Sequence, residues 1–367
     1  MTTTPQFHPL RVLDVRRVTT DAVSVAFDVP AALRDAYRFV QGQFVTLRAT
    51  LQGEEVRRAY SICSSVPSYE QGQPLRVGIK RVPGGRFSNH VNDHLEPGQT
   101  LDVMTPDGRF YAPLDAGQRR HYWGIAGGSG ITPMLSLIAT TLATEPTSHF
   151  TLIYGNRGVS HIMFASELDD LKDTYLQRFQ LLHVLSEEGE TGSPLHGLLN
   201  RDKLRTLLRA LQPGQSSLPD HAFVCGPEPM MDAAEAVLHE LGLAAAATHV
   251  ERFGSFAPSQ ATAALADEAA SAELTVIVDG KHRRTRVGMP TEQGNDTVLD
   301  AGLRAGMVLP YSCKAGNCST CRARVLEGEV RMLKNFALTP DECAAGFVLT
   351  CQCVPVSDKV TVSFDER

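Results

Sequence analysis

Three cysteines lie close together in the run "YSCKAGNCSTC", which spans residues 311–321 of a 367-residue chain. Cys313, Cys318 and Cys321 have the spacing C-x4-C-x2-C, and Cys351 follows with 29 residues between. Four thiolates in this pattern bind two irons bridged by sulfide, and the small residues between them let backbone N–H groups approach the sulfurs. The spacing therefore predicts a [2Fe-2S] cluster with these four cysteines as its metal ligands.

Two alternatives compete with this assignment. A structural zinc site could use two tight cysteine pairs, with Cys353 as its last ligand, but such a site would leave Cys313 without a role. Cys343 and Cys353 also compete with Cys351 for the fourth position. Each of them is better interpreted as a small hydrophobic side chain buried in a core.

A second motif lies in "RRAYSICSS", residues 57–65, where Arg58, Tyr60 and Ser61 form R-x-Y-S. It resembles the flavin-binding motif of the ferredoxin–NADP reductase superfamily. A guanidinium suits a phosphate, an aromatic face suits the isoalloxazine ring, and a hydroxyl suits a hydrogen bond at flavin N5. The alternative is a plain strand that carries one arginine and one tyrosine.

The run "GGRFSNHV" follows about 25 residues later, and its Gly85 and Ser88 match the superfamily's G-x-x-S at the opening of a helix. The N–H groups and dipole of a helix N-terminus bind phosphate, so this turn is expected to hold a pyrophosphate. A pyrophosphate implies FAD rather than FMN. The alternative, a helix capped by Ser88, is compatible because the cap and the anion use the same amides.

A third motif lies in "WGIAGGSGITPMLSL", where a short apolar strand runs into a glycine turn. Gly128 and Gly130 allow close approach to a dinucleotide, whose pyrophosphate sits on the following helix. We expect Thr132 to be the N-cap of that helix and Pro133 its first residue. The form G-G-x-G-I-T-P resembles the NAD(P) turn of the same superfamily.

The run "VCGPEPMM" contains Cys225, Gly226 and Pro227. They resemble the superfamily's C-G-P, whose cysteine lies near nicotinamide C4 and would shape the hydride path sterically. In "HVERF", Glu251 and Phe253 match the carboxylate that the superfamily places near the flavin. The alternatives are a buried strand residue for Cys225 and a solvated strand end for Glu251.

Four segments are needed to position these motifs. Alternating runs such as "AVSVAFDV" and "GQFVTLRA" predict antiparallel strands of a β-barrel flavin domain, whereas alternating strands and helices further on predict a doubly wound α/β nucleotide domain. An Ala- and Ser-rich stretch is interpreted as a linker, either flexible or a fixed spacer. The predicted segments are a flavin domain at 1–115, a nucleotide domain at 116–253, a linker at 254–272 and an α+β, β-grasp [2Fe-2S] domain at 273–367.

The last segment resembles a plant-type ferredoxin over its whole length. A hairpin is predicted around Asp279-Gly280, and "TVLDAGLRAGM" predicts a short amphipathic helix. Lys314, Arg322 and Arg324 lie beside the cluster ligands, and we interpret them as ordinary solvated cations of the surface.

Composition excludes several classes of protein. The net charge of -6 gives no basic excess for nucleic acid, and no stretch approaches the roughly 20 apolar residues that span a bilayer. The first residues lack a basic segment followed by an apolar run, so a cytoplasmic location is expected. Thiols stay reduced in that compartment, which favours metal binding over disulfides.

A reductase followed by a plant-type ferredoxin is the arrangement of several bacterial oxygenase reductases. Among these the chain most resembles the reductase subunits of phenylacetyl-CoA epoxidase (ring 1,2-epoxidase) complexes, through runs such as "AYRFVQGQFVTL" and "LKNFALTPDECAAGFVLTCQ". The resemblance implies that electrons pass from NAD(P)H to FAD, then to the cluster, then to a di-iron oxygenase in phenylacetate degradation.

The choice of nicotinamide rests on Arg157 in "YGNR", which could clamp a 2′-phosphate and favours NADPH over NADH. Arg157 could also be a surface cation. Two alternatives for the whole chain remain open. One is a reductase for another oxygenase, such as a steroid ring hydroxylase, and the other is a redox sensor that binds cofactors without turnover.

Overall fold

The computed structural model describes residues 6–211, 218–254, 271–291 and 294–366. Contacts divide the chain into two units, Phe7–Arg252 and Phe253–Arg367, with Met1–Gln6 assigned to the second. The predicted linker, 254–272, lies almost wholly outside the described residues. The four predicted segment boundaries therefore stay predictions.

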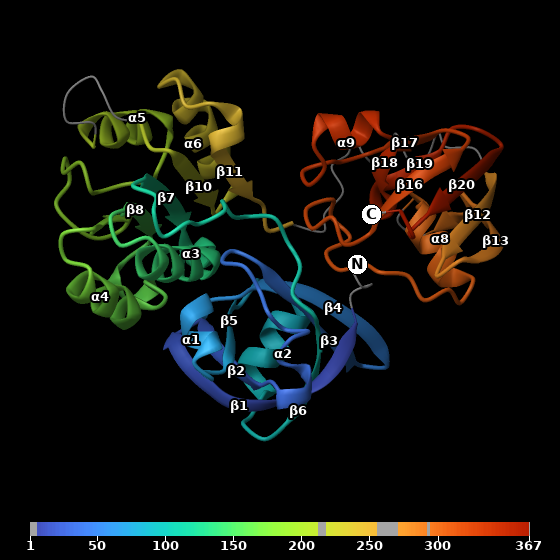
Figure 1. Cartoon of the computed structure of the whole chain (residues 1–367), viewed down its shortest axis with the longest axis horizontal. Coiled ribbons are helices and arrows are strands. Elements are labelled where there is room, and N and C mark those ends of the chain that lie inside the picture. Colours follow the sequence, from blue (N-terminus) through green and yellow to red (C-terminus); the bar gives the residue numbers. More distant parts are fainter. Residues whose placement is uncertain (1–5, 212–217, 255–270, 292–293, 367) are drawn as a thin grey trace. The chain divides into compact units, whose positions relative to one another are not determined.

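Six antiparallel strands form the first sheet, in the order β4-β3-β6-β1-β2-β5 (Figure 1). An isolated bridge between Ile62, just after β4, and Val77 of β5 joins the two edges, so the sheet curls into a barrel. Helix α2 packs into the barrel's core through Phe87 and Val91. The elements are β1 (Phe7–Thr19), β2 (Ala22–Asp28), β3 (Phe44–Leu51), β4 (Glu54–Ser61), α1 (Val66–Glu70), β5 (Leu75–Lys80), α2 (Arg86–His94) and β6 (Thr100–Met104).

Five parallel strands form the second sheet of this unit, in the order β11-β10-β7-β8-β9. Alternate residues of β7 face opposite sides: Tyr122 packs with α3 and α4, whereas Trp123 packs with α5 and α6. Helices therefore cover both faces, and the predicted doubly wound fold is confirmed. The elements are β7 (His121–Gly127), α3 (Ile131–Thr144), β8 (His149–Asn156), α4 (Ala165–Thr174), β9 (Phe179–Leu185), α5 (Arg201–Ala210), β10 (His221–Cys225), α6 (Glu228–Glu240) and β11 (Thr248–Glu251).

The second unit has a mixed sheet in the order β13-β12-β20-β16-β18, in which β12 and β20 are parallel. Helix α8 packs on this sheet through Val298, Leu299 and Ala301, and the cluster loop lies between α8 and β16. The elements are β12 (Ala272–Val278), β13 (Lys281–Val287), β14 (Pro290–Thr291), β15 (Gly294–Asn295), α8 (Val298–Arg304), β16 (Arg322–Glu327), β17 (Val330–Met332), α9 (Pro340–Ala344), β18 (Phe347–Leu349), β19 (Cys353–Pro355) and β20 (Lys359–Ser363).

Two local predictions in this unit are confirmed. Asp279 and Gly280 both have left-handed φ angles, 51° and 69°, as the two central residues of a type I′ hairpin require. Helix α8 begins with a capping box, in which the hydroxyl of Thr297 accepts from the amide of Asp300 and the Asp300 carboxylate accepts in return.

Candidate functional site

Three predicted site residues meet where the two sheets of the first unit adjoin. Ser61 ends β4 of the barrel, whereas Cys225 and Glu251 end the neighbouring parallel strands β10 and β11 and are paired in register. The Ser61 hydroxyl donates a hydrogen bond to Glu251 Oε2 at 3.0 Å. The fold thus assembles the predicted catalytic residues from two different sheets.

Glu251 lies in surroundings that favour its neutral form. Burial raises the pKa of Glu251 to about 8, and the hydrogen bond from Ser61 offsets only part of that rise. A carboxyl with this pKa carries a proton through the neutral range and can release it just above. Such a group is suited to storing and transferring a proton.

Cys225 is fully buried beside Glu251. Burial, together with the Glu251 carboxyl, raises the pKa of the Cys225 thiol well above its usual range. A neutral thiol is a poor nucleophile, so these surroundings are compatible with the steric role suggested by the sequence, which stays a prediction.

The glycine turn and the C-G-P turn pack tightly against each other. A Cβ atom at Gly130 would lie 2.0 Å from the carbonyl oxygen of Cys225, and one at Gly226 would lie 2.9 Å from the backbone nitrogen of Gly127. Glycine is therefore required at Gly130 by the second turn, in addition to any need to approach a ligand.

The start of α3 differs from the prediction. Gly130 is the N-cap and Ile131 the first residue, which makes Thr132 the second and Pro133 the third. The Thr132 hydroxyl donates to the carbonyl of Ser129 at 3.0 Å and accepts no capping bond. The predicted cap is wrong because residues Gly128–Gly130 already form a helical 3-10 turn, which moves the helix start upstream.

A cavity of about 500 Å³ opens at the carboxyl ends of β7, β8 and β9. Its walls include Gly127 and Gly128 of the glycine turn, Pro227 of the C-G-P turn and Arg157 after β8. Doubly wound sheets bind dinucleotides at this edge. The cavity therefore fits the nucleotide site that the three motifs predicted.

The walls of this cavity are basic. Lys80, Arg157, His161 and Arg201 line it, and no Asp or Glu is among the lining residues within the described part of the chain. Lys80 comes from β5 of the barrel, where Asp21 holds its ammonium at 3.5 Å. Both sheets thus contribute positive charge to one cavity.

Sequence reasoning found Arg157 but missed Lys80, His161 and Arg201. Lys80 lies in the predicted flavin domain, outside the predicted bounds of the nucleotide domain. No motif in the sequence indicates that the end of its strand faces the glycine turn. His161 lies in the connection after β8, and Arg201 is the first residue of α5, the helix that follows β9. A doubly wound pattern brings both positions to the ligand edge. That rule, applied to every strand end, could have found the last two.

On the flavin side, Tyr60 of β4 lies against α2, with its ring 5.9 Å from that of Phe87. Arg58 on the same strand is partly buried and donates to the backbone carbonyl of Arg57 at 2.7 Å. Phe253, also predicted to bind the flavin, belongs to the second unit and is 44% exposed. Its contact with the flavin stays a prediction.

Gly85 and Ser88 form the predicted turn at the start of α2. Gly85 is the N-cap, and a Cβ atom on it would lie 2.6 Å from Ser88 Oγ. Ser88 is buried in the first turn, and its Oγ accepts from the amide of Val82 at 3.1 Å. The alternative of a Ser88 cap is therefore wrong, because Ser88 lies inside the helix; the turn fits a pyrophosphate.

In the second unit the four predicted cysteine ligands lie in two pairs. The neighbouring Cys318 thiol is the main influence on the pKa of Cys313, and the Cys321 thiol is the main influence on that of Cys351, so the four sulfurs are neighbours in two pairs. A two-iron cluster binds two thiolates at each iron, so this arrangement fits it. Within the described ranges, no three His, Cys, Asp or Glu side chains gather as a single metal ion would require.

Backbone amides of the loop already point at sulfur. The amide of Cys313 donates to Cys318 Sγ at 3.4 Å, and that of Ala315 donates to Cys313 Sγ at 3.3 Å. Left-handed φ angles of 52° at Lys314 and Ser319 turn the loop toward these contacts. The Cys318 thiol and the backbone amides of Ala315, Asn317 and Cys318 lower the pKa of Cys313, as a thiolate ligand requires.

The two rival cysteines lie elsewhere. Cys353 is fully buried in β19, where burial raises the pKa of its thiol well above the usual range. Cys343 lies in α9, and its sulfur accepts from Asn335 Nδ2 at 3.5 Å. The geometry therefore supports Cys351 as the fourth ligand.

The cations beside the ligands differ in their surroundings. Arg322 forms an ion pair with Glu342 at 3.3 Å and lies over the Phe347 ring at 3.5 Å, with its side chain 14% exposed. Its interpretation as a solvated surface cation is wrong, because the ring and the carboxylate cover it. The side chains of Lys314 and Arg324 are 39% and 45% exposed, and each forms an ion pair with a carboxylate of similar exposure, Asp300 and Glu366 respectively. These two are surface cations, as predicted.

Comparison with known families agrees with these three sites. Residues 9–111 match the oxidoreductase FAD-binding domain, residues 125–236 the oxidoreductase NAD-binding domain, and residues 278–356 the 2Fe-2S iron-sulfur cluster binding domain. A subunit of the 1,2-phenylacetyl-CoA epoxidase of Escherichia coli is 45% identical over 98% of both chains. The chain belongs to the family of oxygenase reductase components.

Other oxygenase reductases are also similar over nearly their full length. The ferredoxin reductase component of 3-ketosteroid-9-alpha-monooxygenase from Rhodococcus rhodochrous is 34% identical over 97% of this chain and 96% of that protein. The glycine betaine monooxygenase reductase subunit of Pseudomonas aeruginosa is 32% identical over 96% and 94%. Such reductases transfer electrons from NAD(P)H through FAD and a 2Fe-2S cluster, and this chain is an oxidoreductase of that kind.

Solved structures show the same fold. Phthalate dioxygenase reductase aligns over 98% of both chains with a TM-score of 0.60 and 22% identity. A self-sufficient cytochrome P450 monooxygenase aligns over 97% of this chain but 41% of its own length, with a TM-score of 0.69 and 21% identity. Among the described helices of the oxygenase reductase, none has the length and apolar character needed to cross a membrane.

Proposed function

We propose that this oxygenase reductase takes hydride from NADPH and delivers single electrons to a di-iron oxygenase component that epoxidises phenylacetyl-CoA. The observation that carries this proposal is the 45% identity to the 1,2-phenylacetyl-CoA epoxidase protein of Escherichia coli over 98% of both chains. The two steroid and betaine reductases are less similar, at 34% and 32%.

For the flavin we assign residues of β4 and the start of α2. Arg58, Gly85 and Ser88 bind the phosphates of FAD, Tyr60 covers a face of its ring, and Ser61 reaches N5. When bound, FAD supplies the conversion of one hydride into two single electrons. The contact between Tyr60 and α2 supports this assignment, since it puts the ring-binding and phosphate-binding residues side by side.

Ser61 and Glu251 hold and move a proton at the N5 edge of the flavin. The Ser61 Oγ would exchange its proton with the Glu251 carboxyl, whose pKa of about 8 allows both release and uptake near neutral pH. Cys225 fills the space beside them with a neutral thiol and so excludes water from the place where the nicotinamide and the flavin meet.

For the nucleotide we assign the glycine turn, Gly226, Pro227 and the basic cavity. Gly128, Gly130 and Thr132 position the pyrophosphate at the start of α3, and Arg157 contacts a 2′-phosphate. The absence of Asp and Glu from the described lining residues supports NADPH over NADH, because a carboxylate there would repel the extra phosphate. Replacing Arg157 with Ala should weaken NADPH binding and leave NADH binding unchanged.

The four paired cysteines, Cys313, Cys318, Cys321 and Cys351, would hold the cluster, which passes electrons on one at a time. We place the protein in the cytoplasm, because clustered cysteines that bind a metal cluster suit a reducing compartment. Neither nucleic acid nor a membrane is part of this proposal.

The test is a reconstituted reaction with purified reductase, NADPH, phenylacetyl-CoA and the di-iron oxygenase component, scored by epoxide product. Cytochrome c reduction is the control for electron flow. Product formation supports both the electron path and the partner. Cytochrome c reduction without product would contradict the partner alone, and a steroid ring hydroxylase would then be the next oxygenase to supply, given the 34% relative.

A further inference from the structure

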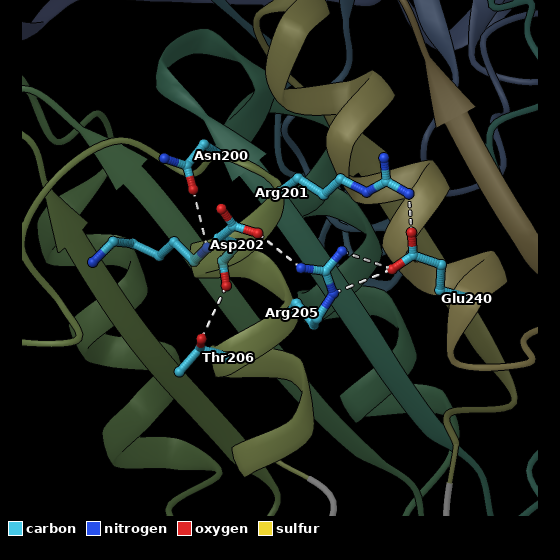
Figure 2. Close-up of polar contacts among 7 residues, drawn as sticks. Asn200, Arg201, Asp202, Arg205, Thr206 and Glu240 are labelled. Carbon is cyan, nitrogen blue, oxygen red and sulfur yellow. Dashed lines mark hydrogen bonds and ion pairs between the residues drawn. The ribbon is translucent and has the colours of Figure 1, made fainter.

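Arg201, the first residue of α5, belongs both to the nucleotide cavity and to a surface ion-pair cluster. It lines the cavity, and its side chain is 57% exposed. Figure 2 shows the side chain stretched from α5 toward Glu240 at the end of α6, where the two form an ion pair. Its guanidinium therefore lies within reach of the cavity rim but is bound to a carboxylate outside it.

The backbone that carries Arg201 is fixed. The preceding residue, Asn200, is the N-cap of α5, and its side chain accepts from the amide of Lys203 at 3.0 Å (Figure 2). Asn200 also lines the cavity. A movement of Arg201 is thus confined to its side chain, and the wall of the cavity stays in place.

Glu240 does not depend on Arg201 for its neutralisation. Arg205, one turn further along α5, donates to Glu240 Oε2 from Nε at 3.2 Å and from Nη2 at 3.1 Å (Figure 2). Arg205 also donates to Asp202 at 2.8 Å. If Arg201 left, Glu240 would keep a two-pronged bond from Arg205, and no charge would become buried and unpaired. Exposed ion pairs of this kind contribute little to stability, so the exchange costs little.

A 2′-phosphate would compete strongly for such a guanidinium. It carries close to two negative charges at neutral pH and offers three acceptor oxygens, which a planar guanidinium binds through parallel hydrogen bonds. No carboxylate is among the described lining residues of the cavity, so no side chain there would compete with the 2′-phosphate for the guanidinium of Arg201. Glu240, by contrast, shares its charge between two arginines.

We propose that Arg201 is a second specificity-determining residue for the nucleotide: it rests on Glu240 and moves to the 2′-phosphate when NADPH binds. Arg157, from the connection after β8, contacts the same phosphate. This inference rests on the proposed use of NADPH. It adds to that proposal a second arginine, Arg201, together with its partner in the absence of nucleotide, Glu240, and the movement of its side chain on binding.

The experiment compares R201A with R205A by equilibrium titration with NADP⁺ and NAD⁺, followed by calorimetry, so that no turnover is involved. R201A should weaken NADP⁺ binding by about tenfold or more, about 1.4 kcal/mol, and change NAD⁺ binding by less than about twofold. R205A is the comparison variant because it removes the other arginine of Glu240, and Arg205 does not line the cavity. It should leave NAD⁺ affinity unchanged and weaken NADP⁺ binding less than R201A does, because Glu240 then holds Arg201 more firmly but the guanidinium of Arg201 is still present.

A third variant, E240Q, tests the resting position. Removing the carboxylate charge releases Arg201, so NADP⁺ should bind as tightly as to the wild type or more tightly. Weaker NADP⁺ binding by E240Q would contradict the movement, because it would mean that Glu240 must hold Arg201 in place for binding.

The outcomes also separate this inference from the proposed function. If the wild type binds NAD⁺ as tightly as NADP⁺, the proposed NADPH preference fails, and this inference fails with it. If the wild type prefers NADP⁺ and R157A loses the preference but R201A keeps it, the role of Arg201 alone is wrong. Equal losses for both nucleotides in R201A would likewise reduce Arg201 to a structural residue.

Discussion

The hydroxyl of Ser61 donates to the carboxyl of Glu251, a residue 190 positions later in the chain and in a different sheet. One end of this bond belongs to the flavin motif and the other to the strand beside Cys225. Because the acceptor has a pKa of about 8, the number of protons held by the pair changes close to neutral pH.

Replacing Glu251 with Gln should slow electron transfer from the reduced flavin to cytochrome c by about 100-fold, the lower end of the range for general acid–base groups. Hydride transfer to N5 needs no proton, but N5 must lose its proton when both electrons leave. The amide keeps the hydrogen bond from Ser61 but cannot accept that proton. Stopped-flow measurement of flavin reoxidation would give the rate. The wild-type rate should rise as pH rises through about 8, where Glu251 loses its proton and becomes able to accept one, and the variant should not show this step. An unchanged pH profile in E251Q would contradict the proton role.

Stability should fall in mild acid because of His249. Burial, and secondarily His221, lower the pKa of His249 to about 4, and its ring stacks on that of Phe223 at 4.6 Å. In the unfolded chain the pKa of a histidine is near 6.5. Between pH 6.5 and 4 the unfolded chain therefore binds a proton at His249, whereas the folded chain does not. The free energy of unfolding should therefore decrease as pH falls from about 6.5 to 4, by on the order of 2 kcal/mol from this residue.

Urea titrations of the wild type and H249F across that range would measure the contribution. The phenylalanine keeps the stacking but cannot titrate, so its stability should depend less on pH. H239Q, which removes an exposed histidine of α6, is the matched control and should keep the wild-type slope. Parallel slopes for the wild type and H249F would show that His249 carries none of the effect.

Replacing Gly130 with Ala should destabilise the first unit. The new methyl would lie 2.0 Å from the Cys225 carbonyl oxygen, which is backbone and cannot rotate away. Overpacking of this kind costs about 1–3 kcal/mol, which denaturant titration detects. In the exposed G117A variant the nearest atom is a flexible Asp115 oxygen at 3.3 Å, so stability should change by less than about 0.5 kcal/mol. Equal effects of the two substitutions would mean that the turns separate easily.

Replacing Cys351 with Ser should remove the cluster, since it takes one thiolate from the Cys321–Cys351 pair. The measurement is iron and acid-labile sulfide per protein, together with flavin bleaching by NADPH, which should persist. C343A and C353A are the controls and should retain both iron and sulfide. Loss of the cluster in C353A with retention in C351S would reassign the fourth ligand.

Much of the site follows from short-range signals in the sequence. The C-x4-C-x2-C spacing predicts a loop whose amides reach sulfur, and Asp279-Gly280 predicts a turn that needs two left-handed residues. Both features depend on residues that lie within a few positions of each other, so a local sequence pattern is enough to predict them. The glycine turn at 127–130 is predictable for the same reason.

Other features depend on contacts that no local pattern contains. Lys80 reaches the nucleotide cavity because a barrel strand ends beside it, and Arg322 is covered by Phe347 from a strand 25 residues later. The N-cap predicted at Thr132 and the alternative cap at Ser88 were wrong for a different reason. The N-cap position of a helix is set by backbone angles. Before α2, Gly85 occupies the N-cap position, and before α3 the turn Gly128–Gly130 is already helical.

The second unit closes its own hydrophobic core, from Ala272 to Phe364, without a residue from the cores of the first. Damage confined to that unit would leave the nucleotide and flavin sheets folded. Such a protein would still oxidise its nicotinamide cofactor at the flavin, but the electrons would lack the cluster as a route to a partner, and dissolved oxygen would accept them and form peroxide. Damage confined to the second unit would therefore have a chemical consequence that loss of the whole chain would not have.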